Sequence, residues 1–441
     1  MIPTSAVFDQ STIAALLEHD PLVADYRAFF ALLDWSCVEQ WQAQRSSRGR
    51  PPHPESAYLK AFLLRIREGL CYTSQLRRFL LNHPLLVIEL GFHLHLDASQ
   101  SYGFDLDKTV PCDYCLREHL HHFDPVLLQR LLQATVTALQ EEIAGLGETV
   151  AFDVKHIYAW VRENNPRVYV PGPFNVSYHP KGDPDCRLGV KKSSNQEQPD
   201  GSTTVKKESL FGYGSGVAAA TDPVYGDVVL AEYTRPFNEA DVTHFRPLFQ
   251  RTVAATRIWP TSITADAAYD YWYVYEMVAH GHGIAAIPLN THGHEEVPRD
   301  PDGTPRCWAG LRMVPTYQFR HTNGYLAQRF RCPLLFPTDT GETCPHAQFA
   351  KGKGCVKDPN WQEGGLMRVL LDRDGPLYRV IYDQRTSCER INSQAQALGI
   401  ERPKVRNGRS VAHLNTLIYL IINVRALAKA ISINRRLLQM N

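Results

Sequence analysis

The fold is decided by residues 149–160, which read TVAFDVKHIYAW. β-Branched and aromatic residues dominate this run, so it predicts a strand. Asp153 lies inside the run, although aspartate is disfavoured within strands. A turn or cap at a strand end would explain one such acid, and so would a site that holds a carboxylate on rigid backbone.

Strands and helices alternate in the sequence that follows. The turn residues between 212–221 and 227–234 predict a hairpin, whereas residues 163–208 are polar and predict a loop or mobile insertion. The next predicted elements are a helix, a strand, a helix and a strand, at residues 241–256, 261–266, 270–280 and 283–289. This order predicts a mixed α/β fold with helices on both faces of a mixed sheet. It is compatible with a ribonuclease-H-like sheet.

Both ends of the chain differ from this core. Residues 1–147 show apolar residues at helical spacing and predict an all-α domain. Residues 291–380 are rich in Pro, Gly and Cys, and we expect a β-rich insertion there. A helix is then expected at about 384–398, and a final helix at about 410–432. The α/β domain is therefore expected to span residues 148–441, with residues 291–380 as its insertion.

Composition limits the classes of protein that fit. Hydrophobic residues make up 44% of the 441-residue chain and charged residues 21%, as in ordinary soluble proteins. The longest apolar run, residues 414–422, is too short to span a bilayer, and the first residues do not resemble a secretory signal. We therefore expect a cytoplasmic protein with no membrane partner.

The net charge of +1 conceals two basic segments. Residues 43–80 contain eight Lys and Arg against two acids, and residues 366–441 contain thirteen against five. Basic ends around an acidic middle fit a protein that binds DNA and also collects metal-binding carboxylates. Solvated helix faces would produce the same pattern.

Two further acids stand in settings that suggest a site. Asp266 ends another apolar strand, and ligands gather at strand C-termini in α/β sheets. Glu389 follows Tyr382 and Arg385 at helical spacing, so the three side chains are expected on one helix face. Arg385 could hold a phosphate there while Glu389 binds metal, although a surface ion pair between them is a simpler interpretation.

Three carboxylates suit phosphodiester cleavage, in which negative charge develops on the attacking and leaving oxygens. Two divalent cations about 3.5–4 Å apart can stabilise both groups. Mg²⁺ prefers oxygen ligands and keeps several waters, so a few carboxylates suffice. Asp153, Asp266 and Glu389 therefore predict a catalytic site for two Mg²⁺ or Mn²⁺ ions.

In these acids and their surroundings the chain resembles bacterial insertion-sequence transposases of the DDE class. The first acid of that family lies in a strand, as Asp153 does. The second opens a motif of Asp, any residue, Gly or Ala, then Tyr or Phe, which DAAY at 266–269 matches. Asp270 extends the match.

The third acid of the family lies in a signature of Tyr, two residues, Arg, three residues, Glu, six residues and Lys. Tyr382, Arg385 and Glu389 match this signature, whereas Gln396 stands at the lysine position. The departure affects one DNA contact and leaves the three acids in place. Other cations could supply the missing charge: Arg390, Lys404 or Arg406.

The resemblance implies a ribonuclease-H-like catalytic domain and a DNA transposase. Enzymes of this class cut DNA at transposon ends and then join the freed 3′-hydroxyl to target DNA. Double-stranded DNA partners, a homodimer on DNA and action at the bacterial nucleoid are implied as well. Two other functions stay open: a catalytically inactive DNA-binding descendant, which Gln396 favours, and a ribonuclease-H-like nuclease without strand transfer.

Four cysteines of the insertion could form a closed tetrahedral zinc site: Cys307, Cys332, Cys344 and Cys355. Such a site would stabilise a region that looks poor in apolar core. The spacings contain no tight CxxC pair, so buried or free thiols are the alternative explanation of these cysteines.

The N-terminal helices contain three candidate DNA contacts, Arg65, Arg77 and Arg78. Helical modules bind DNA through phosphate contacts from Arg and Lys and through helices in the major groove. We therefore predict that this domain recognises DNA ends. A dimerisation or packing domain is the alternative.

Overall fold

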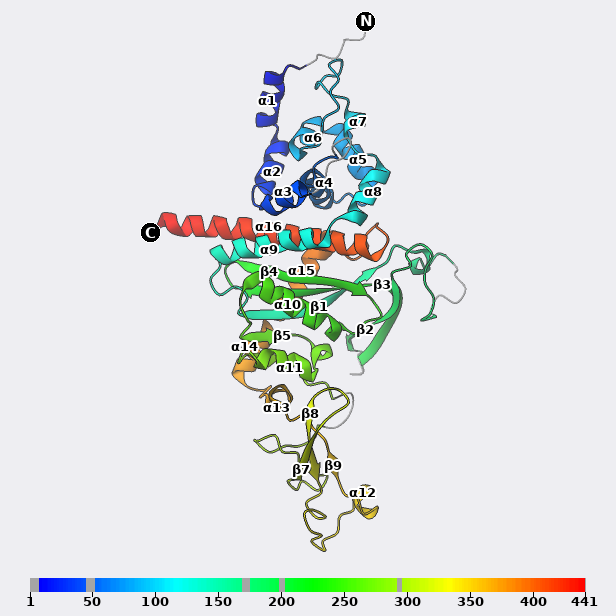
Figure 1. The fold of residues 1–441 in the computed structure, drawn as a ribbon, viewed down its shortest axis with the longest axis vertical. Coiled ribbons are helices and arrows are strands. Elements are labelled where there is room, and N and C mark those ends of the chain that lie inside the picture. Colours follow the sequence, from blue (N-terminus) through cyan, green and yellow to red (C-terminus); the bar gives the residue numbers. More distant parts are fainter. Residues whose placement is uncertain (1–7, 45–51, 169–174, 198–202, 292–295, 441) are drawn as a thin grey trace.

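The computed structural model describes residues 8–44, 52–168, 175–197, 203–291 and 296–440. A helical N-terminal region lies at one end of an elongated molecule, a sheet with its helices lies in the middle, and a smaller β module lies at the other end (Figure 1).

Nine α-helices form the N-terminal region: α1 (Gln10–His19), α2 (Pro21–Phe30), α3 (Ser36–Ala43), α4 (Glu55–Arg67), α5 (Thr73–Asn82), α6 (Pro84–Leu90), α7 (Leu106–Thr109), α8 (Asp113–His122) and α9 (Pro125–Glu142), among the described residues. The central helix α4 is buried on nearly every side, with Leu59, Phe62 and Leu63 at 0% exposure. Asp124 caps α9 by accepting a hydrogen bond from the Val126 amide. The predicted helical character of this region is therefore confirmed for the described residues.

The central sheet contains β1 (Thr149–Tyr158), β2 (Arg187–Glu197), β3 (Thr203–Asp222), β4 (Gly226–Pro236), β5 (Ser262–Thr264) and β6 (Ile284–Ala286). β3 pairs antiparallel with β1 along one edge, and with β2 and then β4 along the other. β1, β5 and β6 are parallel neighbours in that order. The sheet is therefore mixed, as predicted, and β3 and β4 form the predicted hairpin.

The prediction of a loop over residues 163–208 is wrong in part. β2 and the first half of β3 form an antiparallel ribbon there, and the paired residues Arg187 and Gly212 mark its end nearest the rest of the sheet. Main-chain hydrogen bonds hold such a ribbon together and require no apolar side chains. A hydropathy pattern therefore does not reveal it.

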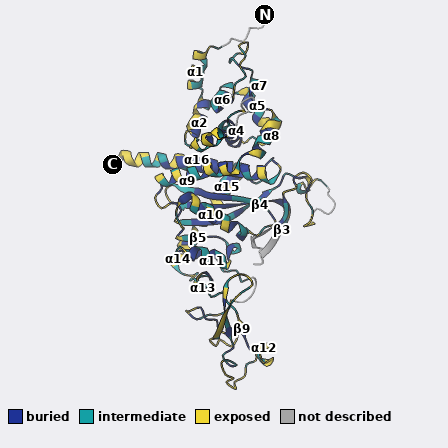
Figure 2. Ribbon diagram, viewed as in Figure 1, coloured by how far each residue is buried: buried dark blue, intermediate teal, exposed yellow. Residues whose placement is uncertain are grey.

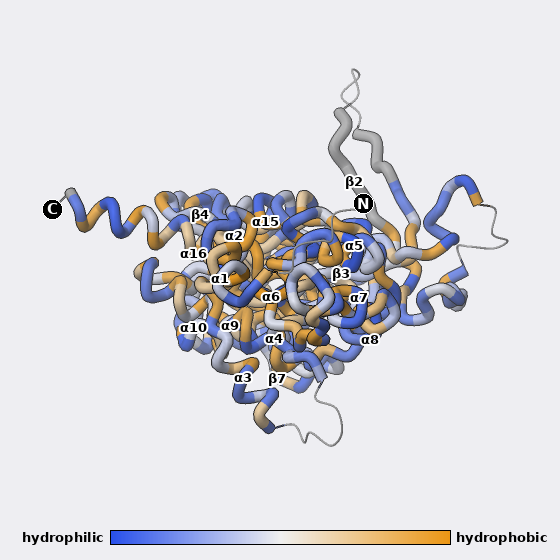
Figure 3. Tube along the Cα trace, turned by 90° about the horizontal axis from the view of Figure 1, so that it is seen from above, coloured by the Kyte–Doolittle hydropathy of each residue, from blue (hydrophilic) through white to orange (hydrophobic). Residues whose placement is uncertain are grey.

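Helices cover both faces of the sheet. Side chains alternate along its strands, so each strand presents apolar side chains to the helices on either face. Phe152 packs against Phe245 of α10 (Phe245–Thr256), with ring centroids 5.1 Å apart. Ala151 and Ile157 point to the opposite face and join the core with the last two helices, α15 (Thr386–Ala397) and α16 (Gly408–Met440). Apolar segments gather in the centre of the molecule when it is seen from above (Figure 3).

The helix α16 is longer than predicted. By length and composition it could cross a membrane, with a mean hydropathy of 1.6. However, 61% of its most apolar stretch is buried inside the protein, where α16 packs on α9 and β4. The buried Asn423 side chain also bonds to both the amide and the carbonyl of Val229. α16 is therefore packed as a core helix, and only its C-terminal end projects (Figure 2).

Along the chain, a second sheet follows the parallel strands and precedes the last helices. It comprises β7 (Val314–Arg320), β8 (Leu326–Arg331) and β9 (Val356–Lys357), followed along the chain by α13 (Glu363–Leu370) and α14 (Pro376–Asp383); the short helix α12 (Ala347–Ala350) precedes β9. The core of this β module is small, with Cys307, Met313, Phe330 and Cys355 buried against Trp361. α13 then returns the chain to α11 (Trp272–Ala279) of the central domain.

Candidate active site

Asp153 and Asp266 lie on neighbouring parallel strands. Ala151 of β1 is in register with Thr264 of β5, and each aspartate follows two residues later in extended backbone. The two acids therefore lie at the same level of strands that are about 4.8 Å apart. Asp266 also begins the 3₁₀ helix η3 (Ala267–Tyr269), where its side chain accepts a hydrogen bond from the Ala268 amide at 2.9 Å.

Helix α15 brings Glu389 and Asn392 to the same part of the sheet. The Asn392 amide donates to Asp153 Oδ2 at 2.9 Å. Glu389 lies one turn earlier, and its carboxylate accepts a hydrogen bond from Arg385 Nη2 at 2.7 Å. The Glu389 side chain is 53% exposed. The third acid is thus paired with its own helical neighbour at the edge of the site.

The aspartates retain protons unusually well. The pKa of Asp153 is raised to about 6, mainly by burial and in smaller part by the charges of Asp266 and Glu389, whereas the Val154 amide and Arg385 act to lower it. Burial likewise raises the pKa of Asp266. The pKa of Asp153 therefore responds to the negative charges of both other predicted acids across the site.

A fourth acid, Asp241, belongs to the same group and was missed by the sequence prediction. It begins the 3₁₀ helix η2 (Asp241–His244) after β4. Burial, followed by the charges of Asp266 and Asp153, raises its pKa to about 7. His156 Nε2 lies 4.0 Å from its carboxylate. An acid in a polar turn has no periodicity, so the apolar patterns that indicated the other two aspartates gave no signal for it.

The acids fit a divalent cation by their charge. Within the described residues, neither Asp153 nor Asp266 has a Lys or Arg within 4.0 Å, and a cation would favour the ionised forms that burial disfavours. No three His, Cys, Asp or Glu side chains in the described ranges are close enough together to hold a metal ion as they stand. Glu389 would have to leave Arg385 to join the aspartates as a third ligand.

The helix predicted at about 384–398 is α15, but the expectation that Tyr382, Arg385 and Glu389 lie on one helix face is wrong. α14 ends at Asp383 and α15 begins at Thr386, so Tyr382 and Glu389 lie on different helices. Between them, the amides of Arg385, Ser387 and Cys388 each bond to the carbonyl three residues earlier, which tightens the turn. Tyr382 instead stacks on Tyr378, with ring centroids 5.5 Å apart.

The residue beside Gln396 is a lysine from another part of the chain. Lys155 Nζ donates to Gln396 Oε1 at 3.1 Å and lies 3.7 Å from Glu401. Lys155 is two residues beyond Asp153, so its ammonium provides positive charge near the position where the family has lysine. The sequence prediction named other cations because this contact joins residues 241 positions apart.

The other predicted DNA contacts fall into three groups. The prediction that Arg65 contacts DNA is wrong, because Arg65 is 3% exposed and its guanidinium donates to the carbonyls of Leu70 and Cys71 within the fold. Two others are engaged in ion pairs, Arg77 with Asp107 and Arg390 with Asp227. The third group is exposed or lines a pocket at the end of β1: Arg78, Lys404 and Arg406.

Among solved structures, the chain is similar to the piggyBac transposase in a synaptic complex with hairpin DNA, determined by cryo-electron microscopy. The TM-score is 0.30 at 10% sequence identity, and the alignment covers 99% of this chain and 83% of that chain. No family model matches the chain, and no curated protein matches it. A likeness of this size assigns neither fold nor function.

The replacement Asp241→Asn should stabilise the protein at about pH 8 and not at about pH 4. The folded state prefers protonated Asp241, so its contribution is complete below the ordinary pKa of 3.8 and is lost as the pH rises through about 7. Asparagine removes that loss, on the order of 1–2 kcal/mol after solvent screening. Thermal unfolding across this pH range measures the effect, with the exposed Asp374→Asn as control. An unchanged pH profile in Asp241→Asn would contradict the shift.

Proposed function

We propose that the chain is a DDE-class DNA transposase that cleaves DNA at transposon ends and transfers the strand into target DNA. The placement of Asp153 and Asp266 at one level of adjacent strands, with the charge of Glu389 acting on Asp153, is the observation that supports this most. The mixed sheet is compatible with the ribonuclease-H-like fold that the sequence resemblance implies. Its partners would be two kinds of duplex DNA, the transposon ends and the target. A homodimer would bind them in the cytoplasm.

The acids would hold two Mg²⁺ or Mn²⁺ ions, which when bound stabilise charge on the attacking and leaving oxygens. Asp153 would be the shared ligand, because it lies between Asp266 and α15. Asn392 keeps its carboxylate oriented through the 2.9 Å hydrogen bond. When Glu389 turns to the aspartates, the guanidinium of Arg385 is released and can bind a DNA phosphate.

A plasmid assay tests this function. A supercoiled plasmid containing the coding gene with its flanking DNA is incubated with the protein and Mg²⁺. We expect cleavage at the element ends followed by joining to target DNA. Binding without cleavage would indicate an inactive DNA-binding descendant, and cleavage without joining would indicate a nuclease.

We further propose that the β module binds structural zinc. Cys307, Cys332 and Cys355 are buried, and Cys355 Sγ lies 3.7 Å from His346 Nδ1. Burial raises the pKa of the Cys355 thiol, and the charges of the other three cysteines raise it further, so they lie within electrostatic reach of Cys355, although zinc binding would require the side chains to move closer together. A core of four buried residues is small for a separate module, and a metal would stabilise it.

Removing zinc should unfold the β module and leave the central sheet folded. We expect the purified protein to contain about one zinc per chain, and Cys332→Ser to lose it. Metal analysis and hydrogen exchange over residues 296–362 measure both effects. Cys186→Ser, which changes a buried thiol at the start of β2, is the control. A protein free of zinc with a protected β module would contradict this proposal.

A further inference from the structure

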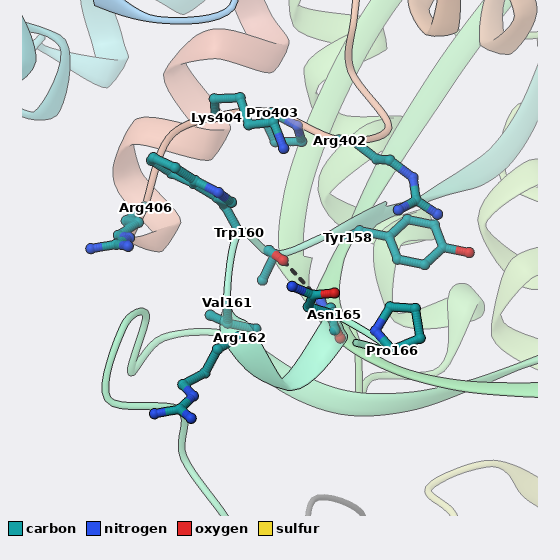
Figure 4. A pocket seen from close by; sticks show the side chains of 12 residues that line it. Tyr158, Trp160, Val161, Arg162, Asn165, Pro166, Arg402, Pro403, Lys404 and Arg406 are labelled. Carbon is teal, nitrogen blue, oxygen red and sulfur yellow. Dashed lines mark hydrogen bonds between the residues drawn. The ribbon is translucent and has the colours of Figure 1, made fainter. Parts of the chain in front are cut away.

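A pocket of about 390 Å³ opens where β1 ends. Tyr158 and Trp160 line it from the strand and the turn that follows, and Arg402, Lys404 and Arg406 line it from the segment between α15 and α16 (Figure 4). Two segments far apart in the sequence thus enclose it, and the cations of one lie against the aromatic rings of the other.

Hydrogen bonds fix both walls to the sheet. The Asn164 amide donates to the carbonyls of Ala159 (2.8 Å) and Phe211 (2.7 Å), and its Oδ1 accepts from the Phe211 amide (2.9 Å). The Tyr158 amide donates to the Glu401 carbonyl at 2.9 Å, which joins the cationic segment to β1. The pocket is therefore part of the folded framework.

The cations of the pocket are positioned by aromatic rings. The Arg402 guanidinium lies 4.2 Å from the centre of the Tyr158 ring. Arg406 and Lys404 lie 4.8 Å and 5.8 Å from that of Trp160. Contacts of this kind orient a cation without neutralising its charge.

Positive charge is left over in this pocket. Within the described residues, no carboxylate lies within ion-pair distance of Arg402, Lys404 or Arg406, or of Arg162 on the rim. Several N–H donors are thus available to an anion, and guanidinium groups match phosphate geometry especially well.

We propose that this pocket binds one nucleotide of an unpaired DNA strand, with its phosphate on the cations and its base against the aromatic rings. The proposal rests on the proposed function and extends it. A base can stack on a side chain only where it is unpaired, and rings beside cations are typical of single-strand binding.

The pocket and the candidate active site lie along the same strand. Tyr158 is five residues beyond Asp153 on β1, which is about 17 Å. Because side chains alternate along a strand, the Tyr158 ring points to the opposite face of β1 from Asp153 and Lys155. A DNA strand that leaves the acids would therefore have to pass the end of β1 to reach this ring.

Binding measurements without metal test this proposal. Fluorescence anisotropy compares a single-stranded oligonucleotide with a blunt duplex, using the full chain. Trp160→Ala should weaken single-strand binding about fivefold or more, and Trp160→Phe should retain most of it. Arg406→Ala should reduce the salt slope by about 0.7. Arg436→Ala, which removes an exposed charge near the end of α16, is the matched control and should bind as wild type.

The outcomes separate the two proposals. The pocket proposal alone would be overturned if Trp160→Ala and Arg406→Ala bound single strands as wild type does. It would also be overturned if Arg436→Ala weakened binding as much as they do. A wild-type protein that binds neither oligonucleotide would overturn the proposed function as well. Thermal unfolding of each variant confirms that it is folded before binding is compared.

Discussion

Replacing Asp153 with asparagine should abolish metal-dependent DNA cleavage, lowering its rate at least about 1,000-fold. The change removes the negative charge of Asp153, the acid proposed as the shared metal ligand, while keeping the shape of the side chain. The variant should stay folded, because an uncharged amide at this buried position does not incur the cost of burying a charge, which is what raises the pKa of the acid. DNA binding should remain, since no phosphate contact is removed. Cleavage of the supercoiled plasmid and gel-shift binding measure the two effects.

Asp383→Asn is the matched control for this experiment. Asp383 is an exposed acid at the end of α14, near the signature residues, and no side-chain ion pair of it is found in the described part of the chain. It should cleave as wild type does. Cleavage retained in Asp153→Asn would remove Asp153 from the active site.

Replacing Arg368 with leucine should destabilise the protein by about 3–5 kcal/mol, because it leaves a buried charge unpaired. Arg368 of α13 binds the Asp270 carboxylate through two hydrogen bonds of 2.8 and 2.6 Å. The Asp270 side chain is fully buried and also accepts from Tyr275 and from the Asn290 amide. This pair joins the helix after the β module to the loop that follows Asp266.

Chemical denaturation of the full chain measures that loss. Arg379→Leu is the control, because Arg379 is exposed on α14 and should change stability little. If both variants unfolded at the same denaturant concentration as wild type, the Arg368–Asp270 pair would not be what fixes α13 to the central domain.

Strands with an alternating or continuous apolar pattern could be predicted from the sequence. β1 and the β3–β4 hairpin lie close to where turn residues and β-branched side chains placed them, because these strands bury side chains on one or both faces. β2 could not be predicted, since it is held by main-chain pairing with β3 in a polar segment. The extent of α16 was also underestimated, because its last two turns are mostly exposed and lack the apolar pattern.

The same distinction applies to the site. Asp153 and Asp266 could be proposed from the sequence because Asp153 interrupts an apolar strand and Asp266 ends one, and a shared register then places them together. Asp241, Asn392 and Lys155 could not be found in this way. Each acts across the fold on a residue distant in sequence, as in the contact between Asn392 and Asp153, 239 positions apart. Polar residues in turns and on helix surfaces have no pattern that distinguishes such a role.

Crystals of the full chain grown with Mn²⁺ provide the most direct test of the metal site, because anomalous scattering locates manganese without reference to activity. The proposed site predicts manganese bound directly to the carboxylates of Asp153 and Asp266, with Glu389 turned away from Arg385 toward the ion. Fully occupied manganese elsewhere on the chain, with these carboxylates free of metal, would contradict it.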